Sequence, residues 1–124
     1  MRGQRLFIRP IDAADHDSVR DFLRAHGHDA GPPACGLLGK LVGNLVAVVG
    51  MQITADAVLI DEIVVAPDLR RKRVARLMLD ELEQLAGKID RRHLVVEDRP
   101  DRAEFLQRVG FEREGVRWIR RVRG

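Results

Sequence analysis

The hydrophobic and polar positions of this chain change their spacing several times, and each change predicts a different element of secondary structure. Short apolar or alternating segments bounded by turn residues are typical of strands, whereas apolar residues that recur every three or four positions are typical of helices. The two kinds of segment alternate along the chain, which predicts an α/β (α+β) fold, a mixed sheet of about six or seven strands with about three helices. The expected strands are residues 6–9, 34–38, 41–53, 57–66, 93–97, 112–115 and 116–122.

Three segments have the apolar spacing of helices, and the second shows it most clearly. The expected helices are residues 15–26, 74–87 and 100–110. Asp15 is placed to cap the first of them, because a carboxylate at that position accepts hydrogen bonds from the free N–H groups of the first turn. A hairpin turn at Gly39–Lys40 is expected to join the second and third strands, since glycine beside a polar residue commonly marks such a turn.

Length and composition place the chain among globular proteins. Its 124 residues, 45% of them apolar, suffice for a single domain spanning residues 1–124 with its own core. The net charge of +3 hides 22 basic and 19 acidic residues, so the places where basic residues gather are more informative than the total. The longest apolar run is too short to cross a bilayer, and no membrane partner is expected. The single cysteine, Cys35, permits no internal disulfide, which favours the cytoplasm and a structural thiol.

Residues 58–76, VLIDEIVVAPDLRRKRVAR, carry the most informative pattern in the chain. An apolar, β-branched strand ends near Pro67, a dense basic turn follows, and an amphipathic helix begins directly after it. The first N–H groups of a helix have no partner within the helix, and the helix dipole favours negative charge there. The arrangement therefore predicts a site for a diphosphate. The basic side chains gathered there are Arg70, Arg71, Lys72, Arg73 and Arg76.

This stretch resembles the cofactor-binding motif of the GNAT superfamily of N-acetyltransferases. In that motif Arg or Gln is followed by two residues, a Gly, one further residue, and a Gly or Ala. Arg70 matches the first position and Ala75 the last, whereas Arg73 stands where the first glycine is usual. The segment 103–111, AEFLQRVGF, is similar to the family's late helix that ends in Gly-Phe. The resemblance covers about residues 5–115 and implies a GNAT-like acyl-CoA N-acyltransferase fold, in which two central strands splay apart around the pantetheine arm of the cofactor.

The resemblance also implies acetyl-CoA as the acyl donor and direct transfer to an amine. In the family, the strand before the loop contacts the pantetheine arm through its backbone, and the start of the helix contacts the pyrophosphate. An amine-bearing small molecule or protein would be the acceptor. Carried over to this sequence, the donor-binding residues are Ile63, Val65, Arg70, Arg71, Lys72, Arg73, Val74, Ala75 and Arg76.

Acetyl transfer to an amine needs a base for the amine, a donor for the developing oxyanion, and preferably an acid for the leaving thiolate. Family members often use as the acid a tyrosine at the position that Leu106 occupies here, and this chain has no tyrosine. Carboxylates near the strand ends are the candidate bases, namely Asp61, Glu62, Glu97 and Asp98. We favour Glu62, which interrupts an apolar strand beside the expected thioester, and strand alternation is expected to turn Asp61 to the other face.

Two alternatives to catalysis are also open. The replacements at Arg73 and Leu106 favour a GNAT-fold module that binds an acyl-CoA or a protein without turnover. A nucleic-acid-binding domain is disfavoured, because one Trp and no Tyr leave few rings for base stacking. Its basic surface would include a second cluster at Arg113, Arg117, Arg120, Arg121 and Arg123.

The four histidines suggest no metal site. His16, His26, His28 and His93 show no spacing that would hold a metal together with a carboxylate. We interpret His26 and His28 as favourable charges at the end of a helix.

The acceptor site is expected to be less enclosed than in most of the family. Family members usually wall it with a pair of helices between the first two strands. Residues 10–33 leave room for one helix and a loop. The site is therefore expected to be open, or to be completed by a second copy of the chain in a homodimer.

Overall fold

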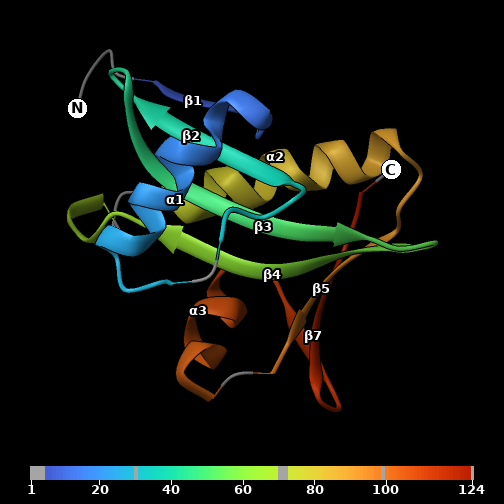
Figure 1. The fold of residues 1–124 in the computed structure, drawn as a ribbon. Coiled ribbons are helices and arrows are strands. Elements are labelled where there is room, and N and C mark those ends of the chain that lie inside the picture. The colour runs from blue at the N-terminus through green and yellow to red at the C-terminus, as the bar shows by residue number, and fades with distance from the viewer. Residues whose placement is uncertain (1–4, 30, 70–72, 99, 124) are drawn as a thin grey trace.

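A computed structural model describes residues 5–29, 31–69, 73–98 and 100–123 of the protein (Figure 1). In this part of the chain one mixed sheet of seven strands runs in the order β1-β2-β3-β4-β5-β7-β6, and three α-helices lie against it, which confirms the expected fold class. The strands are β1 (Leu6–Pro10), β2 (Gly36–Leu41), β3 (Asn44–Ile53), β4 (Ala57–Val65), β5 (His93–Glu97), β6 (Glu112–Glu114) and β7 (Arg117–Arg121). The helices are α1 (His16–Ala25), α2 (Val74–Lys88) and α3 (Ala103–Arg108), with short 3-10 segments η1 (Ala13–Asp15), η2 (Pro67–Leu69) and η3 (Pro100–Arg102).

The helices α1 and α2 cover opposite faces of the sheet (Figure 1). α1 buries Val19 and Leu23 in one hydrophobic cluster, and α2 buries Met78 in the other. In β3 the neighbours Val48 and Val49 belong to different clusters, as the two-residue period of a strand requires. The apolar runs of the central strands therefore supply both cores, which is why these strands contain so few polar positions.

The turn between β2 and β3 differs from the one expected. It lies at Val42–Gly43 and not at Gly39–Lys40, and both of its residues have positive φ, 51° for Val42 and 80° for Gly43. A two-residue loop of this kind is a type I′ turn, whose twist matches that of the two strands. The expectation was wrong because valine favours strands and is rare in the left-handed region.

The strands β4 and β5 run parallel and then separate. Their pairing stops at Ile60 and Val96, although β4 continues to Val65. A β-bulge in β4 adds Asp61 opposite Gly50 and its neighbour in β3. A bulge bends its strand and increases the local twist. The last residues of β4 therefore diverge from β5, which is the splay that the resemblance implied.

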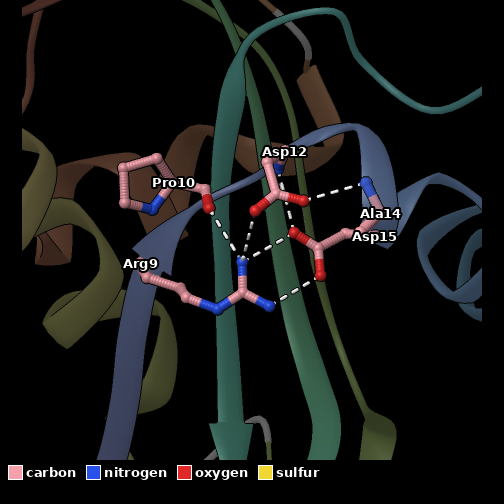
Figure 2. Close-up of polar contacts among 5 residues, drawn as sticks. All are labelled: Arg9, Pro10, Asp12, Ala14 and Asp15. Atoms are coloured by element: carbon pink, nitrogen blue, oxygen red, sulfur yellow. Dashed lines mark hydrogen bonds and ion pairs between the residues drawn. The ribbon is translucent and has the colours of Figure 1, made fainter.

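Asp15 is the N-cap residue of α1, as expected, but its carboxylate makes no capping hydrogen bond to that helix. The Asp12 carboxylate accepts the Ala14 N–H at 2.9 Å, and the Asp15 carboxylate accepts the Asp12 N–H at 2.9 Å, which together form a capping box around η1. Asp15 also faces Arg9, whose two terminal nitrogens each lie 2.6 Å from one carboxylate oxygen (Figure 2). This guanidinium holds the pKa of the Asp15 carboxyl well below its usual range. The ion pair thus joins β1 to the start of α1.

Two arginines of the second basic cluster bind carboxylates within the fold. Arg120 is largely buried, and its guanidinium lies 2.8 Å from Asp80 and 3.0 Å from Glu83, both on α2. Arg113 lies 2.9 Å from Asp98. Because these charges are paired, the cluster offers less free positive charge to a polyanion than the sequence suggests, which further disfavours the nucleic-acid alternative.

Candidate active site

Two cavities lie beside the point where β4 leaves β5. The smaller has a volume of about 310 Å³ and is lined chiefly by β4 and β5. The larger has a volume of about 900 Å³ and lies between the end of β4, the start of α2 and the segment that contains η3 and α3. Ile63 and Arg102 line both cavities, so the two spaces meet at these residues. A donor in one cavity and an acceptor in the other would be brought together there.

The larger cavity is basic in the part that the structure describes. Arg76 donates its Nη2 to the Arg108 carbonyl at 2.7 Å, which ties the start of α2 to the end of α3. A concave surface with this excess of positive charge suits an anion that carries several charges. Its basic lining residues are His28, Arg73, Arg76, Arg102 and Arg108, with the carboxylate of Asp101 among them.

Arg73 stands immediately before α2 as its N-cap, with φ of 62° and ψ of 15°. This left-handed conformation costs an L-residue about 1–2 kcal/mol, whereas glycine adopts it freely. The glycine that is usual here in the family therefore answers a backbone requirement, and Arg73 meets the same requirement at a cost. Its side chain is exposed and lines the larger cavity. Arg70, Arg71 and Lys72, which were expected to act beside it, lie outside the described residues.

The first residues of α2 contribute to this cavity mainly through their backbone. The side chains of Val74 and Ala75 are buried in the core. The N–H groups of a first helical turn have no partner within the helix. Together with the exposed Arg76, they form the positive end of a helix directed at the larger cavity.

The two β4 residues expected to contact the pantetheine arm differ in their present contacts. Val65 lines the larger cavity and is aligned with Ala47 of β3 in the sheet. The Ile63 carbonyl accepts a hydrogen bond from Nη1 of Arg102 at 3.2 Å. A pantetheine amide that bonded to this carbonyl would compete with Arg102.

The smaller cavity collects carboxylates. Asp61, Glu62 and Glu97 all line it, together with Arg102 and Arg117. The expectation that Asp61 and Glu62 face opposite ways was wrong, because the bulge at Asp61 interrupts the alternation of β4. Three carboxylates around one space suit the ammonium form of an amine.

Glu62 is the least exposed of these three carboxylates. Its side chain is 17% exposed, and its Oε2 lies 3.7 Å from Nδ1 of His28. Asp61 differs in that it is exposed and accepts hydrogen bonds from Nε2 of Gln52 at 3.2 and 3.3 Å. Glu62 is thus the more sheltered of the two carboxylates.

The contacts of Asp98 and Leu106, two other positions named from the sequence, show what surrounds each side chain. Asp98 accepts the indole N–H of Trp118 at 2.9 Å and pairs with Arg113, so it holds the end of β5 in place and is a poor candidate for the base. Leu106 is fully buried in the core and also lines the smaller cavity. The position that the resemblance aligns with a family tyrosine therefore borders this cavity.

Arg102 and His28 also belong to the site, although neither is expected there from the sequence. Arg102 is one of many arginines, and only the splay of β4 from β5 brings it to Ile63. His28 did have a signal, because Gly27 ends α1 and fixes the direction of the residue that follows. Among the described residues, no group of three or more His, Cys, Asp and Glu side chains is arranged to hold a metal ion. The same part of the chain contains no helix long and apolar enough to cross a membrane.

The sheet order, the splay and the helix start after a left-handed residue define the class of acyl-CoA N-acyltransferase folds. Residues 35–113 match the family of acetyltransferase (GNAT) domains, and the chain belongs to this family. A relative, the mycothiol acetyltransferase of Geodermatophilus obscurus, is 47% identical over 55 residues, which cover 44% of this chain and 18% of that protein. The chain thus spans less than a fifth of the length of that relative.

Solved structures confirm the fold over nearly the whole chain. The ribosomal-protein-S18-alanine N-acetyltransferase of Escherichia coli superposes with a TM-score of 0.78 at 15% identity, covering 97% of this chain and 96% of that one. The N-acetylglutamate synthase of Neisseria gonorrhoeae, complexed with coenzyme A and N-acetyl-glutamate, gives 0.77 at 15% identity over 97% of this chain and 36% of that one. An aminoglycoside 6'-N-acetyltransferase complexed with coenzyme A gives 0.79 at 12% identity, over 95% and 98%.

Proposed function

We propose that the protein is an N-acetyltransferase that moves an acetyl group from acetyl-CoA directly to the amine of a small molecule or a protein. The observation that carries the proposal is the meeting of a basic cavity and a carboxylate-lined cavity at Ile63, where β4 leaves β5. The basic side suits the phosphates of the donor, and the acidic side suits a cationic amine. The thioester would lie between them.

The donor-binding residues would act in two groups. The backbone at the start of α2 and the side chains of Arg70, Arg71, Lys72, Arg73 and Arg76 would hold the pyrophosphate. The backbone of Ile63 and Val65 would align the pantetheine arm along the splayed end of β4. For that, Arg102 would release the Ile63 carbonyl, which it now holds at 3.2 Å.

The carboxylate of Glu62 would drive the removal of a proton from the acceptor. It is the sheltered carboxylate of the smaller cavity and has no arginine or lysine within ion-pair distance among the described residues. Leu106 offers no proton to the leaving sulfur. A thiol has an ordinary pKa of about 8.5, so a thiolate can leave unaided. The reaction then lacks the rate acceleration of roughly 10²–10⁴-fold that a general acid or base supplies.

The second candidate is a GNAT-fold module that binds an acyl-CoA or a protein without turnover. The contact between Arg102 and Ile63 favours it, because this contact occupies the carbonyl that the donor arm is expected to use. The test compares the affinities of CoA and of 3′-phosphoadenosine 5′-diphosphate, which lacks the arm. Arg102→Ala should raise the ratio of the CoA affinity to that of the fragment by up to about tenfold if the arm takes this carbonyl, since a net hydrogen bond contributes about 0.5–1.5 kcal/mol. An unchanged ratio would mean that the arm lies elsewhere.

Calorimetric titration with acetyl-CoA, followed by thiol release with a panel of amines, tests the main proposal. The panel contains a peptide with an N-terminal alanine, an aminoglycoside and L-glutamate, after the activities named for the structural neighbours. The double substitution Arg70→Ala and Arg76→Ala should weaken binding and leave the fold intact, because exposed charges contribute little stability. The matched control removes two exposed arginines of the C-terminal segment, Arg121 and Arg123, and should leave affinity unchanged.

Three outcomes decide between the candidates. Binding that depends on the loop arginines, together with release of thiol, supports the transferase. Tight binding with no release over the whole panel supports the non-catalytic module. Binding that is indifferent to Arg70 and Arg76 would show that the donor site has been misplaced. A cytoplasmic location, a single domain and a homodimer stay predictions, to be checked by fractionation, limited proteolysis and sedimentation.

A further inference from the structure

His28 and Glu62 form a pair at the junction of the two cavities. Nδ1 of the imidazole lies 3.7 Å from Oε2 of the carboxylate, with the side chains 33% and 17% exposed. His28 lines the larger cavity and Glu62 the smaller, on either side of Ile63, which lines both. The pair therefore lies next to the place where the donor and the acceptor would meet.

The backbone fixes His28 in this position. Gly27 has a φ of 82°, its N–H bonds to the Arg24 carbonyl at 3.1 Å, and the His28 N–H bonds to the Leu23 carbonyl at 2.8 Å. These two bonds are those of a Schellman motif, in which a left-handed glycine ends the helix and the next residue turns back across it. His28 is thus held at the end of α1, while its ring can reach toward the end of β4.

The sheet makes room for the partner carboxylate. Gly50 of β3 lies opposite Glu62, and a Cβ at Gly50 would come within 3.1 Å of Pro33 and 3.3 Å of the Glu62 Cγ. A larger residue would crowd the Glu62 side chain. Glycine at this point therefore leaves room for the Glu62 side chain.

We propose that His28 is the base that takes the proton from the acceptor amine, and that Glu62 is a positioning residue that holds the imidazole through Nδ1. This inference rests on the proposed function and replaces a lone carboxylate with a His–Glu pair. Imidazole titrates nearer to neutrality than any other unperturbed side chain, which suits it to accept a proton there. With Nδ1 directed at Glu62, Nε2 is the nitrogen left to face the substrate. The separation of 3.7 Å is one that can tighten when substrate binds.

The ammonium form of the acceptor loses two protons in the step. One ammonium proton passes to Nε2 of His28, and the neutral amine attacks the thioester carbon. The C–N bond forms, the C–S bond breaks, and its electron pair leaves with the sulfur. The second proton lost by the nitrogen goes to the thiolate, which gives the thiol, and His28 returns its proton to water. Acetyl-CoA and an ammonium thus give an amide, CoA and one free proton.

The decisive experiment combines His28→Ala with added imidazole, in the intact protein. The rate of thiol release should fall by about 10²-fold or more, as expected for loss of a base, while the acetyl-CoA affinity by calorimetry stays within about threefold. Free imidazole should restore part of the rate. His16→Ala, at the exposed start of α1, is the matched control and should change neither quantity. An unchanged rate in His28→Ala, or a loss that imidazole does not restore, overturns the proposal and leaves the transferase function standing.

A second measurement reads the pair without turnover. In the neutral ring, the ¹⁵N shifts of His28 should place the proton on Nδ1, toward Glu62, and Glu62→Ala should move it to Nε2. A tautomer that Glu62→Ala does not alter would show that the carboxylate does not position the ring. Added imidazole should restore no activity in Glu62→Ala, because this variant still contains the imidazole of His28. Absence of turnover in the parent over the whole panel would overturn the base role together with the proposed function.

Discussion

Replacing Arg73 with glycine tests how far the helix start is adapted to a bound phosphate. Arg73 holds the left-handed conformation at the N-cap of α2, with φ of 62°. An L-residue loses about 1–2 kcal/mol in this region, and glycine avoids that cost but adds about 0.4–1 kcal/mol of unfolded-state entropy to be lost on folding. The balance predicts that Arg73→Gly stabilises the fold by about 0.5–1 kcal/mol.

The same substitution should affect CoA affinity only slightly. The backbone already has the geometry that the family's glycine provides, so the amides of α2 need not move. What is lost is one exposed guanidinium beside the larger cavity, and an exposed ion pair contributes about 0.2–1 kcal/mol. We therefore expect a dissociation constant raised by no more than about fivefold. Urea denaturation gives the stability, and calorimetric titration with CoA at low and moderate salt gives the affinity.

Asp90 supplies the control, because it also has positive φ, 58°, but follows the far end of α2. Asp90→Gly should leave CoA affinity unchanged, and it should stabilise the fold less, since aspartate tolerates this region better than arginine does. A gain in CoA affinity of more than tenfold in Arg73→Gly would refute the reasoning. It would show that the Arg73 side chain fills the phosphate position, and it would favour the non-catalytic module.

Two further predictions concern the fold. Val42→Asn should raise stability by about 1 kcal/mol, and the melting temperature by about 4 °C, because asparagine suits the left-handed first position of the type I′ turn before Gly43. Val116→Asn should not, because this exposed valine lies in the turn between β6 and β7 and has no positive φ. The lowered pKa of Asp15, caused chiefly by Arg9, stabilises the fold above the ordinary carboxyl pKa of about 3.9, and this contribution is lost as pH falls through the folded-state value. The urea midpoint of Asp15→Asn should therefore be lower than that of the parent at pH 7, and the two midpoints should converge as the pH falls below about 4. A difference between the midpoints that does not change with pH would contradict this linkage.

The sequence predicted well what depends on neighbouring residues. The amphipathic period of α2 and the apolar runs of β3 and β4 place both clusters of the core, because burial on one helix face or on both strand faces leaves a direct pattern. The basic turn before Val74 predicted the start of α2, because the helical spacing of apolar residues begins directly after it. The position of the hairpin turn was missed, because Val42 is held in an unfavourable conformation by the strands on either side of it.

Features that depend on contacts between distant residues were not predictable. Asp15 is the N-cap residue of α1, as the sequence indicates, but its carboxylate makes no capping hydrogen bond there, and its main partner is Arg9 on β1. The bulge at Asp61 carries no local signal, although it brings two neighbouring carboxylates to one cavity. The contact between Arg102 and Ile63 likewise exists only because two strands separate. The proposed donor site could therefore be suggested from the sequence, whereas the groups that line the smaller cavity could not.

Leu106 provides the last prediction, because the resemblance aligns it with the tyrosine that the family often uses as an acid. It is fully buried, yet it lines the smaller cavity, which has a volume of about 310 Å³. A phenol at this position can extend into that volume, so Leu106→Tyr should fold, at a cost of up to about 1–3 kcal/mol for the larger ring. Denaturation with urea measures this cost.

If the hydroxyl of that ring reaches the leaving sulfur, it replaces an unaided departure with an acid-assisted one. The rate of thiol release should then rise by about tenfold or more, a part of the 10²–10⁴-fold that a well-placed acid supplies, while CoA affinity changes little. The parent rate should rise with pH, because more of the amine is neutral and a thiolate is then a stable product. In Leu106→Tyr this rise should be smaller. Leu106→Phe fills the same volume without a proton to give, so an equal rate in the Phe and Tyr variants would mean that position 106 acts by packing alone.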